Sequence, residues 1–361
     1  MYLKAISLIQ FKNYGSAQFE FSPSLNFFTG QNGAGKTNLL DGIHYLCLGK
    51  SYFHTSDQQG IQHQAAFFRM EGKFLQEPEE IQVNCVYAGG GRKELSKNGV
   101  IYQRLTDHVG NIPVVMIAPD DHSLINEGSD ERRRFIDNTI SQIDHPYLED
   151  LVGYNKVLQQ RNAALKGFAM RRIFDAGLIE AFNQQLVTFG EKIFQKRRFY
   201  LQKMAPLIKS FYAMICEEKE SITTEYQSVL QQRDFMGALQ ASLEKDRQLE
   251  RTTEGIHRDE FEFCLDQQPI KRFGSQGQKK TFLMSLKLAQ WELIKSEKSK
   301  TPILLLDDLF DKLDENRSKK ILDLVAADSF GQVFITDTSV SRLVKPLASI
   351  KKEYRNIKIG G

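Results

Sequence analysis

Cysteine is scarce in this sequence. Only four occur in 361 residues, and none belongs to a C-x-x-C pair or to another metal-ligand spacing. That pattern excludes a disulfide framework and a cysteine-based zinc site. We therefore expect reduced, mostly buried thiols in an intracellular protein at Cys47, Cys85, Cys216 and Cys264.

Long apolar runs are also missing. The sequence contains no stretch of about 18 apolar residues, which a membrane-spanning helix would need. Its first residues, MYLKAISLIQF, lack the basic-then-apolar layout of a signal peptide. These absences predict a cytoplasmic protein with no membrane partner. There is no internal repeat or low-complexity linker either, so ordinary globular domains are expected.

A large net charge is lacking as well. The formal charge of +3 is too small to indicate a nucleic-acid partner by itself. Between residues 151 and 210, however, eleven lysines and arginines stand against three acids, a local excess of eight. This excess is either a solvated helical face or a surface that meets phosphates. In QKRRFYLQK, basic residues alternate with Phe199 and Tyr200, which fits DNA contact or a helix core with snorkelling side chains.

The pattern of expected elements changes along the chain. Strands are predicted at 2–11, 25–30 and 112–119, and a helix over 36–49 that stops at a glycine. Residues 81–102 have the pattern of a hairpin whose loose, basic turn is AGGGRKELSKNG. Amphipathic helices follow at 129–143, 147–168 and 178–218. Strand patterns return at 260–266, 302–310 and 332–338, and Trp291 has the helical spacing of a core residue.

This order predicts an α/β domain built from both ends of the chain. We expect its two parts at residues 1–120 and 252–361, with an inserted helical lobe at residues 121–251.

A phosphate loop lies after the second expected strand. GQNGAGKT, Gly30 to Thr37, fits G-x-x-x-x-G-K-[ST] with a strand before it and a helix after it, so a ligand-free glycine turn is disfavoured. Lys36 would reach the β- and γ-phosphates, and Thr37 Oγ would ligate Mg²⁺. The candidate nucleotide-binding residues are Gly30, Gln31, Asn32, Gly33, Ala34, Gly35, Lys36, Thr37 and Asn38.

An acidic pair follows a late apolar strand. PILLLDDLFDKLD ends its strand at Asp307, which would hold the Mg²⁺, and Asp308 would orient or deprotonate the attacking water. An acidic turn that merely caps a strand is the alternative. Two adjacent acids favour hydrolysis over binding alone, so Lys36, Asp307 and Asp308 are catalytic candidates. No NKxD base-reading motif occurs, which favours ATP over GTP.

A second anion-binding turn precedes the acidic strand by about thirty residues. RFGSQGQKKTFLMSLKLAQ, residues 272–290, opens a helix with a flexible turn whose N–H groups and dipole favour negative charge. The same order occurs in ATP-binding-cassette ATPases, in which this signature turn completes the site of a partner subunit. Ser275, as a catalytic residue, and Gly277 and Gln278 are thus predicted to contact the γ-phosphate of a second copy. The prediction is a head-to-tail homodimer that forms with ATP.

These motifs belong to a longer series of blocks. FKNY (Phe11–Tyr14), ERRRFIDNTISQID (Glu131–Asp144), LQQRNAALK (Leu158–Lys166) and EGIHRDEFEF (Glu254–Phe263), with the three motifs above, resemble the RecF family in order and over nearly the whole chain. The resemblance implies a P-loop ATPase head of the ABC/SMC type with an inserted helical lobe. It also implies DNA repair and replication, ATP-dependent dimerisation on single-stranded, gapped or duplex DNA, and slow, DNA-stimulated hydrolysis. RecR and RecO are the implied partners, and RecA an indirect one.

Some positions depart from that family. Ile256 stands where proline is common, and Lys12 where arginine is common, which keeps the charge but loses a planar fork. Thr336 and Asp337 occupy the place of the transporter switch histidine. Arg132–Arg134 either begin a solvated helix or lie near the nucleotide or the lobe boundary, where they would relay the ATP state to DNA contacts. His257–Asp259 belong either to a polar strand entry or, as the resemblance implies, to a structural or functional site, and the sequence does not decide either role.

Other ATPase classes fit less well. An ABC transporter subunit is the alternative function, but the long helical insertion and the missing histidine count against it. A nuclease with an SMC-like head would need a further catalytic domain after the last head strand. A true SMC protein would need hundreds of residues of heptad coiled coil, and the sequence has none.

Overall fold

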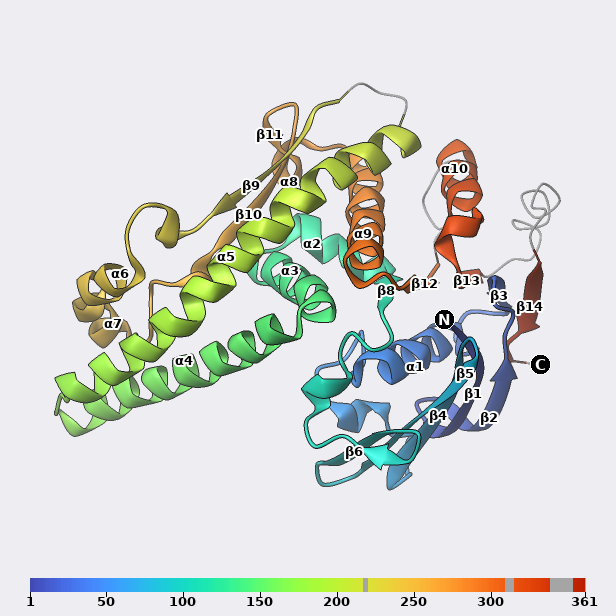
Figure 1. The fold of residues 1–361 in the computed structure, drawn as a ribbon, viewed down its shortest axis with the longest axis horizontal. Helices are drawn as coiled ribbons and strands as arrows, with labels where there is room; N and C mark the ends of the chain where they lie inside the picture. Colours follow the sequence, from blue (N-terminus) through green and yellow to red (C-terminus); the bar gives the residue numbers. More distant parts are fainter. Residues whose placement is uncertain (217–219, 309–314, 338–352, 361) are drawn as a thin grey trace. The chain divides into compact units, whose positions relative to one another are not determined.

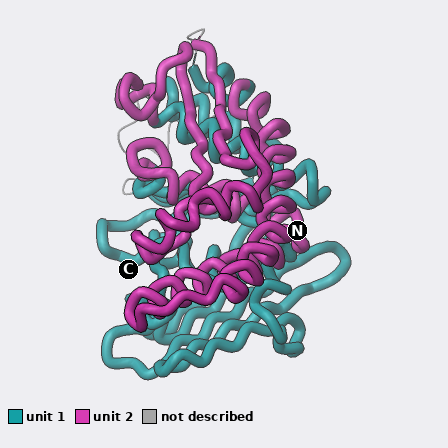
Figure 2. The backbone as a smooth tube through the Cα atoms, turned by 90° about the vertical axis from the view of Figure 1, so that its left-hand side faces the viewer, with its two compact units in different colours: residues 1–121, 210–218, 280–361 teal, residues 122–209, 219–279 magenta. Residues whose placement is uncertain are grey.

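The computed structural model describes residues 1–216, 220–308, 315–337 and 353–360. The chain divides into two compact units, coloured separately in Figure 2. Unit 1 comprises Met1–Asp121, Ser210–Glu218 and Lys280–Gly361, and unit 2 comprises His122–Lys209 and Lys219–Lys279. Each unit is described by itself, with the element labels of Figure 1.

A five-stranded parallel sheet forms the centre of unit 1. Its order is β14 (Tyr354–Lys358), β3 (Leu25–Thr29), β13 (Val333–Asp337), β12 (Ile303–Leu306) and β8 (Val114–Ile117). The three inner strands and the edge strand β8 are buried along their whole length, which explains their largely apolar sequences. Because every pair is parallel, the carboxyl ends of β3, β12 and β13 meet at one edge.

A six-stranded antiparallel sheet completes the strands of unit 1. Its order is β2 (Tyr14–Glu20), β1 (Tyr2–Phe11), β4 (Phe67–Gln76), β5 (Glu79–Ala88), β6 (Arg92–Lys97) and β7 (Val100–Ile101). Helix α1 (Lys36–Leu48) contacts strands of both sheets. One apolar cluster therefore joins the two sheets, with Leu40, Phe68 and Phe334 among its buried members.

The predicted hairpin turn of residues 88–99 was wrong. Strand β6 lies inside that segment and pairs with β5, Cys85 opposite Leu95, so only Gly89–Gly91 are left to make the turn. Leu95 is the one buried residue of β6, and its neighbours are mostly charged. A polar strand close to a sheet edge lacks the apolar alternation that marks strands in a sequence.

The remaining helices of unit 1 include the long α9 (Gln276–Lys298), which begins in unit 2, and α10 (Glu315–Val325). Trp291 of α9 is fully buried, stacks on Phe330 with 4.2 Å between ring centroids, and donates a 2.9 Å hydrogen bond to the Pro302 carbonyl. Its predicted core position is confirmed. Short 3₁₀ turns occur at Asp57–Gly60, Leu105–His108, Pro119–His122 and Asp328–Phe330.

Unit 2 combines helices with a small sheet. The helices are α2 (Ser123–Asn126), α3 (Ser129–Ile143), α4 (His145–Arg171), α5 (Ala176–Ile215, whose last turns belong to unit 1), α6 (Phe235–Ala241), α7 (Leu243–Leu249) and α8 (Ile270–Phe273). Strands β11 (Gln268–Pro269), β10 (Glu260–Leu265) and β9 (Ile222–Gln227) form an antiparallel sheet. Short 3₁₀ turns lie at Val229–Gln231 and Ile256–Arg258.

Helices α4 and α5 form an antiparallel hairpin, visible in Figure 1. Three side-chain pairs cross it in antiparallel register: Asp144 with Lys196, Asp150 with Lys192, and Arg161 with Asn183. The predicted long helices of this region are confirmed, and α3 has the predicted bounds.

The unit boundaries differ from the expected division at residue 252. Residues 252–279 cluster with unit 2 because β10 pairs with β9 along its length, from Glu260 opposite Gln227 to Leu265 opposite Ile222. Helical periodicity alone does not reveal such a sheet.

All four cysteines are free and buried, and burial raises the pKa of the Cys85 thiol to about 12. Among the described helices, none combines the length and the apolar character needed to cross a bilayer.

Candidate nucleotide site

The phosphate loop leaves β3 and turns sharply into α1. Gly35 caps α1 in the left-handed region, with φ of 111°. The backbone angle favours glycine, and a Cβ at this position would lie 2.5 Å from Asn13 Nδ2 and displace that side chain. The first N–H groups of α1 consequently lie at the mouth of the loop, where an anion would meet them.

Lys36 is the first residue of α1, and its side chain folds back over the loop. Its Nζ donates to the carbonyls of Gly30 at 2.7 Å and Gln31 at 3.0 Å. The ammonium group is thus held at the loop by neutral acceptors, and a phosphate would offer it an anionic one.

Thr37 and Asp307 meet although 270 residues separate them in the sequence. Thr37 Oγ1 lies 3.0 Å from both carboxylate oxygens of Asp307. Thr336 Oγ1, at the end of β13, also donates to Asp307 at 2.8 Å, and accepts the Asp308 N–H at 2.7 Å. The parallel sheet explains this convergence, because the carboxyl ends of β3, β12 and β13 are neighbours.

A cleft of about 290 Å³ opens at this edge. Its walls come from the phosphate loop, the ends of β12 and β13, and Pro119, which follows β8. The lining residues are Asn32, Gly33, Gly35, Lys36, Thr37, Asn38, Pro119, Asp307, Asp308 and Thr336. The structure therefore brings the predicted Lys36, Thr37, Asp307 and Asp308 to one cleft.

The electrostatics of Asp307 fit a bound cation. Burial raises the pKa of this carboxyl, and Asp308 raises it further, while hydrogen bonds from Thr336 and Thr37 and the charge of Lys36 lower it. A buried carboxylate beside a second acid is stabilised by a divalent ion. Carboxylate and hydroxyl oxygens are also the ligands that Mg²⁺ takes beside phosphates. Asp307 and Thr37 therefore fit the predicted magnesium position.

Two polar side chains that support the loop, Asn13 and Tyr14, were not predicted as site residues, and Asn13 also contacts the predicted Asn38. Asn13 Nδ2 donates to the Ala34 carbonyl at 3.2 Å, Asn38 Nδ2 donates to Asn13 Oδ1 at 2.8 Å, and the Tyr14 hydroxyl donates to the Gly35 carbonyl at 3.0 Å. Asn13 and Tyr14 belong to the FKNY block, so the motif was visible but its contact with the loop was not.

The last described residues form another wall of the loop. Ile359 N–H donates to the Thr29 carbonyl at 2.8 Å, directly after β14. A Cβ at Gly30 would lie 2.3 Å from the Ile359 carbonyl oxygen, and a Cβ at Gly360 would lie 2.9 Å from Ala34 Cβ. Nothing local in the sequence signals this approach, because over 300 residues separate the two segments.

The signature turn lies in unit 2, whereas the phosphate loop and Asp307 lie in unit 1. Ser275 precedes α9 and forms a reciprocal cap with Gln278: Ser275 N–H donates to Gln278 Oε1 at 2.7 Å, and Gln278 N–H donates to Ser275 Oγ at 3.2 Å. The helix begins at Gln276, directly after Ser275. Gly277 lies in the first turn of this helix, and anion binding at that turn stays a prediction.

Helix α9 and helix α1 are linked by buried charges inside unit 1. Lys287 of α9 donates to the Tyr52 hydroxyl at 2.7 Å and to Asp121 at 3.0 Å. Tyr52 N–H in turn donates to Asp41 of α1 at 2.7 Å, and Lys12 pairs with the same carboxylate at 2.7 Å. Lys12 therefore pairs with Asp41 through a single ammonium group, whereas the longer, planar guanidinium group of an arginine could make two parallel hydrogen bonds.

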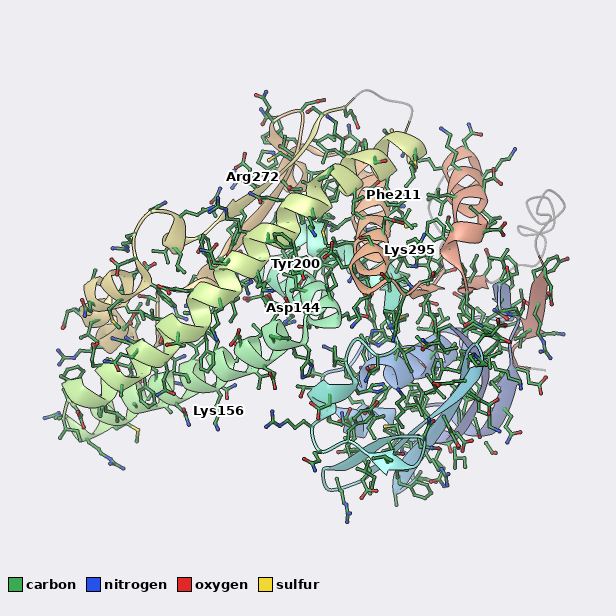
Figure 3. The ribbon with its side chains drawn as sticks, in the orientation of Figure 1. Asp144, Lys156, Tyr200, Phe211, Arg272 and Lys295 are labelled. Atoms are coloured by element: carbon green, nitrogen blue, oxygen red, sulfur yellow. The ribbon has the colours of Figure 1, made fainter. Side chains whose placement is uncertain are left out.

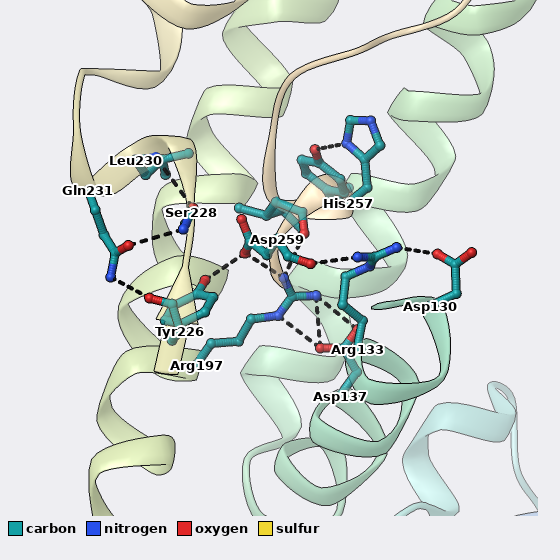
Figure 4. Close-up of polar contacts among 12 residues, drawn as sticks. Asp130, Arg133, Asp137, Arg197, Tyr226, Ser228, Leu230, Gln231, His257 and Asp259 are labelled. Atoms are coloured by element: carbon teal, nitrogen blue, oxygen red, sulfur yellow. Dashed lines mark hydrogen bonds and ion pairs between the residues drawn. The ribbon is translucent and has the colours of Figure 1, made fainter. Parts of the chain in front are cut away.

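The blocks without an assigned role form the interior of unit 2 (Figure 4). Arg197, only 2% exposed, binds both carboxylate oxygens of Asp137 at 3.0 Å, and donates to Asp259 at 2.8 Å and to the Ile256 carbonyl at 2.7 Å. The Tyr226 hydroxyl donates to Asp259 at 2.6 Å. Arg197 thus ties α5 to α3 and to the start of β10.

The three arginines of the ERRRF block differ in burial: Arg132 is buried, Arg133 is half-buried and Arg134 is exposed. Arg132 pairs with Glu260 and Arg133 donates to the Asp259 carbonyl, whereas Arg134 is exposed and pairs with Glu131 of its own helix. His257 accepts from the Tyr154 hydroxyl at 2.8 Å, and burial lowers its pKa to about 4. It is therefore neutral near pH 7, so these contacts give the two blocks a structural explanation.

A profile described as RecF/RecN/SMC N terminal domain matches residues 2–347. The protein named DNA replication and repair protein RecF of Flavobacterium johnsoniae is 43% identical over 355 residues, which cover 98% of this chain and 99% of the relative. The protein of the same name from Phocaeicola vulgatus is 44% identical over 98% of this chain and 95% of its own length.

The chain belongs to the RecF family. Solved structures agree with this assignment. A structure described as the recombination mediator protein RecF-ATPrS in the RecFOR pathway has a TM-score of 0.89 and 30% identity, and covers 99% of this chain and 96% of its own. A structure of RecF-ATP from the same pathway matches equally well. The Smc head domain of Pyrococcus furiosus, at 16% identity and a TM-score of 0.56, shares the fold.

Membership of the RecF family confirms the resemblance and the predicted fold class. It also makes the transporter alternative the weaker one, since the relatives that match over nearly the full length are named as DNA replication and repair proteins.

Proposed function

We propose that this protein is an ATPase that binds ATP and Mg²⁺ in the cleft of unit 1 and uses ATP to control a DNA-bound dimer. One observation carries the nucleotide assignment: Thr37 Oγ1 and the Asp307 carboxylate, 270 residues apart in sequence, lie 3.0 Å apart beside the phosphate loop. The contact between these two side chains is not part of a helix or of a sheet, but together they offer oxygen ligands to one Mg²⁺. The relatives solved as RecF-ATP and RecF-ATPrS support the choice of nucleotide.

Each residue of the cleft then has a distinct task. The N–H groups of the loop and the Lys36 ammonium hold the phosphates, and Thr37 and Asp307 hold the ion. When bound, Mg²⁺ neutralises charge on the phosphates. The Asp308 carboxylate accepts a proton from the attacking water. Thr336 fixes the backbone of Asp308 and one oxygen of Asp307, so it positions both acids.

The signature turn is proposed to act on the nucleotide of a second copy. The cap with Gln278 uses Ser275 Oγ as an acceptor, so its O–H can donate to a γ-phosphate. The N-terminal end of α9 adds N–H groups and a favourable dipole. Two sites would be completed head to tail, and the dimer would dissociate after slow hydrolysis.

The wider role follows family membership. The dimer would bind single-stranded, gapped or duplex DNA in the cytoplasm, with DNA stimulating hydrolysis. RecR and RecO would be its partners, and RecA an indirect one, as the RecFOR pathway of the solved relative suggests.

The dimer is tested by light scattering with and without ATP. Ser275→Arg and Ser275→Asp should bind ATP as monomers and fail to dimerise, because bulk or negative charge would meet the γ-phosphate. Asp308→Asn should keep the ATP-bound dimer for longer than the natural protein, because the water is no longer deprotonated.

Ser275→Asn is the matched control, because asparagine caps a helix as well as serine does. If the asparagine and aspartate variants dimerise alike, charge at this turn does not matter and the proposed contact is wrong. A mass that does not change with ATP in the natural protein would refute the dimer itself.

A further inference from the structure

Ten of the eleven cations between residues 151 and 210 fall into two classes in the structure, and the eleventh, Lys203, lies 4.4 Å from the centroid of the Phe199 ring. Four of the eleven cations are neutralised: Arg161 by Asp246, Lys192 by Asp150, Lys196 by Asp144, and Arg197 by Asp137 and Asp259. Within the described parts of the chain, six others make no ion pair: Lys156, Lys166, Arg171, Arg172, Arg198 and Lys209. Lys156 lies on α4 (Figure 3), and the next three gather at the end of the same helix.

That end of the α4–α5 hairpin is also unusually apolar. Residues 169–178, here called the hairpin tip, are all exposed. Met170 is 85% exposed and Ile173 is 55% exposed, and Phe174 and Leu178 are exposed too. Single exposed apolar residues are ordinary, but four within nine positions, with two arginines between them, mark an interaction site.

The hairpin tip is a built turn. Ile173 N–H donates to the Phe168 carbonyl at 3.2 Å, and Arg172 takes the left-handed conformation that ends α4. Asp175 Oδ1 accepts the Leu178 N–H at 2.9 Å and thereby caps the start of α5. The one acid of the tip, Asp175, is thus engaged with the backbone, and Arg171 and Arg172 are the exposed cations of the tip.

Two aromatic contacts hold the turn in place. The Phe174 ring meets Phe168 edge to face at 5.6 Å between centroids, and the Arg247 guanidinium of α7 lies 4.4 Å from the Phe174 ring centroid. Because the backbone and Phe174 are fixed, Met170 and Ile173 can enter a binding partner without the entropic cost of ordering a loop.

We infer that the hairpin tip contacts nucleic acid, with Arg171 and Arg172 on phosphates and Met170 and Ile173 inserted against an unstacked base. Proteins that kink or open DNA insert Met, Ile, Leu or Phe between base steps and flank them with basic residues. A tip of ten residues is much smaller than the roughly 20–30 residues a side of a stable protein interface. One inserted side chain at a DNA end or gap needs far less area.

This inference rests on the proposed DNA-binding function and adds a location and a preferred form of DNA. Bases at the edge of a gap or at a single-strand junction are already half unstacked, so insertion there costs less than inside a duplex.

The test uses the full chain with a gapped duplex that carries 2-aminopurine beside the gap. Met170→Ala with Ile173→Ala should abolish the rise in 2-aminopurine fluorescence and weaken binding of the gapped duplex about tenfold, with less effect on intact duplex. Arg171→Ala with Arg172→Ala should weaken binding of every form of DNA. It should also lower the slope of log affinity against log salt by about 1.4–1.8.

Val152→Ala is the matched control, since Val152 is exposed on the same helix about five turns from Met170. It should bind and unstack DNA like the natural protein, and all variants should keep the natural thermal midpoint. If both tip variants bind gapped DNA normally while ATP still controls binding, the tip is not the contact but the proposed function stands. If the natural protein binds no DNA, both fail.

Two further results would overturn the inference. If only the arginine variant loses DNA binding and the apolar variant still unstacks the base, the tip contacts DNA phosphates but inserts no side chain. Binding of the natural protein to anionic phosphatidylglycerol vesicles, lost in the apolar variant while DNA binding is kept, would make the tip a lipid-binding site.

Discussion

Replacing Arg197 with methionine should destabilise unit 2 selectively. The substitution keeps much of the side-chain volume but removes the charge that faces Asp137 and Asp259. Breaking a buried ion pair by removing one partner costs about 3–5 kcal/mol. Because the Asp137 side chain is 16% exposed and Asp259 keeps its bond from Tyr226, we expect the lower end, about 3 kcal/mol.

The chain allows the two units to be followed separately. Its one tryptophan, Trp291, is buried in unit 1, so tryptophan emission reports the unfolding of that unit. Unit 2 holds α3, α4 and most of α5, so far-UV circular dichroism is weighted toward its helices. In urea, Arg197→Met should lower the midpoint of the dichroism transition by at least about 1 M and leave that of the emission in place.

Arg198→Met is the control, because Arg198 is the next residue of the same helix but is exposed and makes no ion pair within the described chain. It should change stability by less than about 0.5 kcal/mol. Equal effects of the two substitutions, or an unchanged dichroism midpoint in Arg197→Met, would refute the assignment of Arg197 as a buried charge.

The pH dependence of the Arg197→Met defect has a definite sign. Burial raises the pKa of Asp259 above its ordinary value, and Arg197 opposes that shift. Without Arg197 the folded-state pKa rises further, so the folded state binds a proton more readily than the unfolded chain. The defect should therefore be larger at about pH 8 than at about pH 5, since acid neutralises the unpaired carboxylate. A defect that grows toward acid would contradict this.

Two other substitutions test unit 1. Lys287→Met removes the charge that Asp121 and Tyr52 face, so the urea midpoint of tryptophan emission should fall by about 1 M or more. The urea midpoint of the dichroism of unit 2 should stay unchanged. A shift confined to the dichroism midpoint would show that the contact is not part of unit 1. Lys36→Met should weaken ATP binding, measured by calorimetry, at least about tenfold. The stability of the fold should change little, because the Lys36 ammonium group donates to two loop carbonyls. An unchanged affinity for ATP would show that Lys36 is not part of the phosphate site.

The local parts of the candidate site could be predicted from the sequence, and the structure places Lys36, Thr37 and Asp307 along one cleft. GQNGAGKT and PILLLDD are contiguous, their residue types follow from phosphate and cation chemistry, and the flanking apolar strands are strong signals. Once both motifs are placed at strand ends, a parallel sheet brings them together.

Non-local contacts were hidden for identifiable reasons. Arg197 and Arg198 are neighbours in one basic run, yet one is buried against two carboxylates and the other is exposed. A charged residue carries no mark of its partner in the sequence, so the run could be interpreted as a surface or as a core. The sheet of β9, β10 and β11 and the approach of Ile359 to Gly30 likewise depend on chain segments that meet only in the folded state.

The strand order of the parallel sheet has a consequence for synthesis of the protein. Strand β3 emerges from the ribosome early, but its neighbours β13 and β14 begin at Val333 and Tyr354. At about 5–20 residues per second, the apolar LNFFT segment waits roughly 15–60 s for its first partner. Unit 2 is complete in the meantime, because its last residue is Lys279. The nascent chain therefore carries a folded unit 2 beside an unpaired strand of unit 1, and we expect a chaperone to protect that strand until the last 30 or so residues arrive.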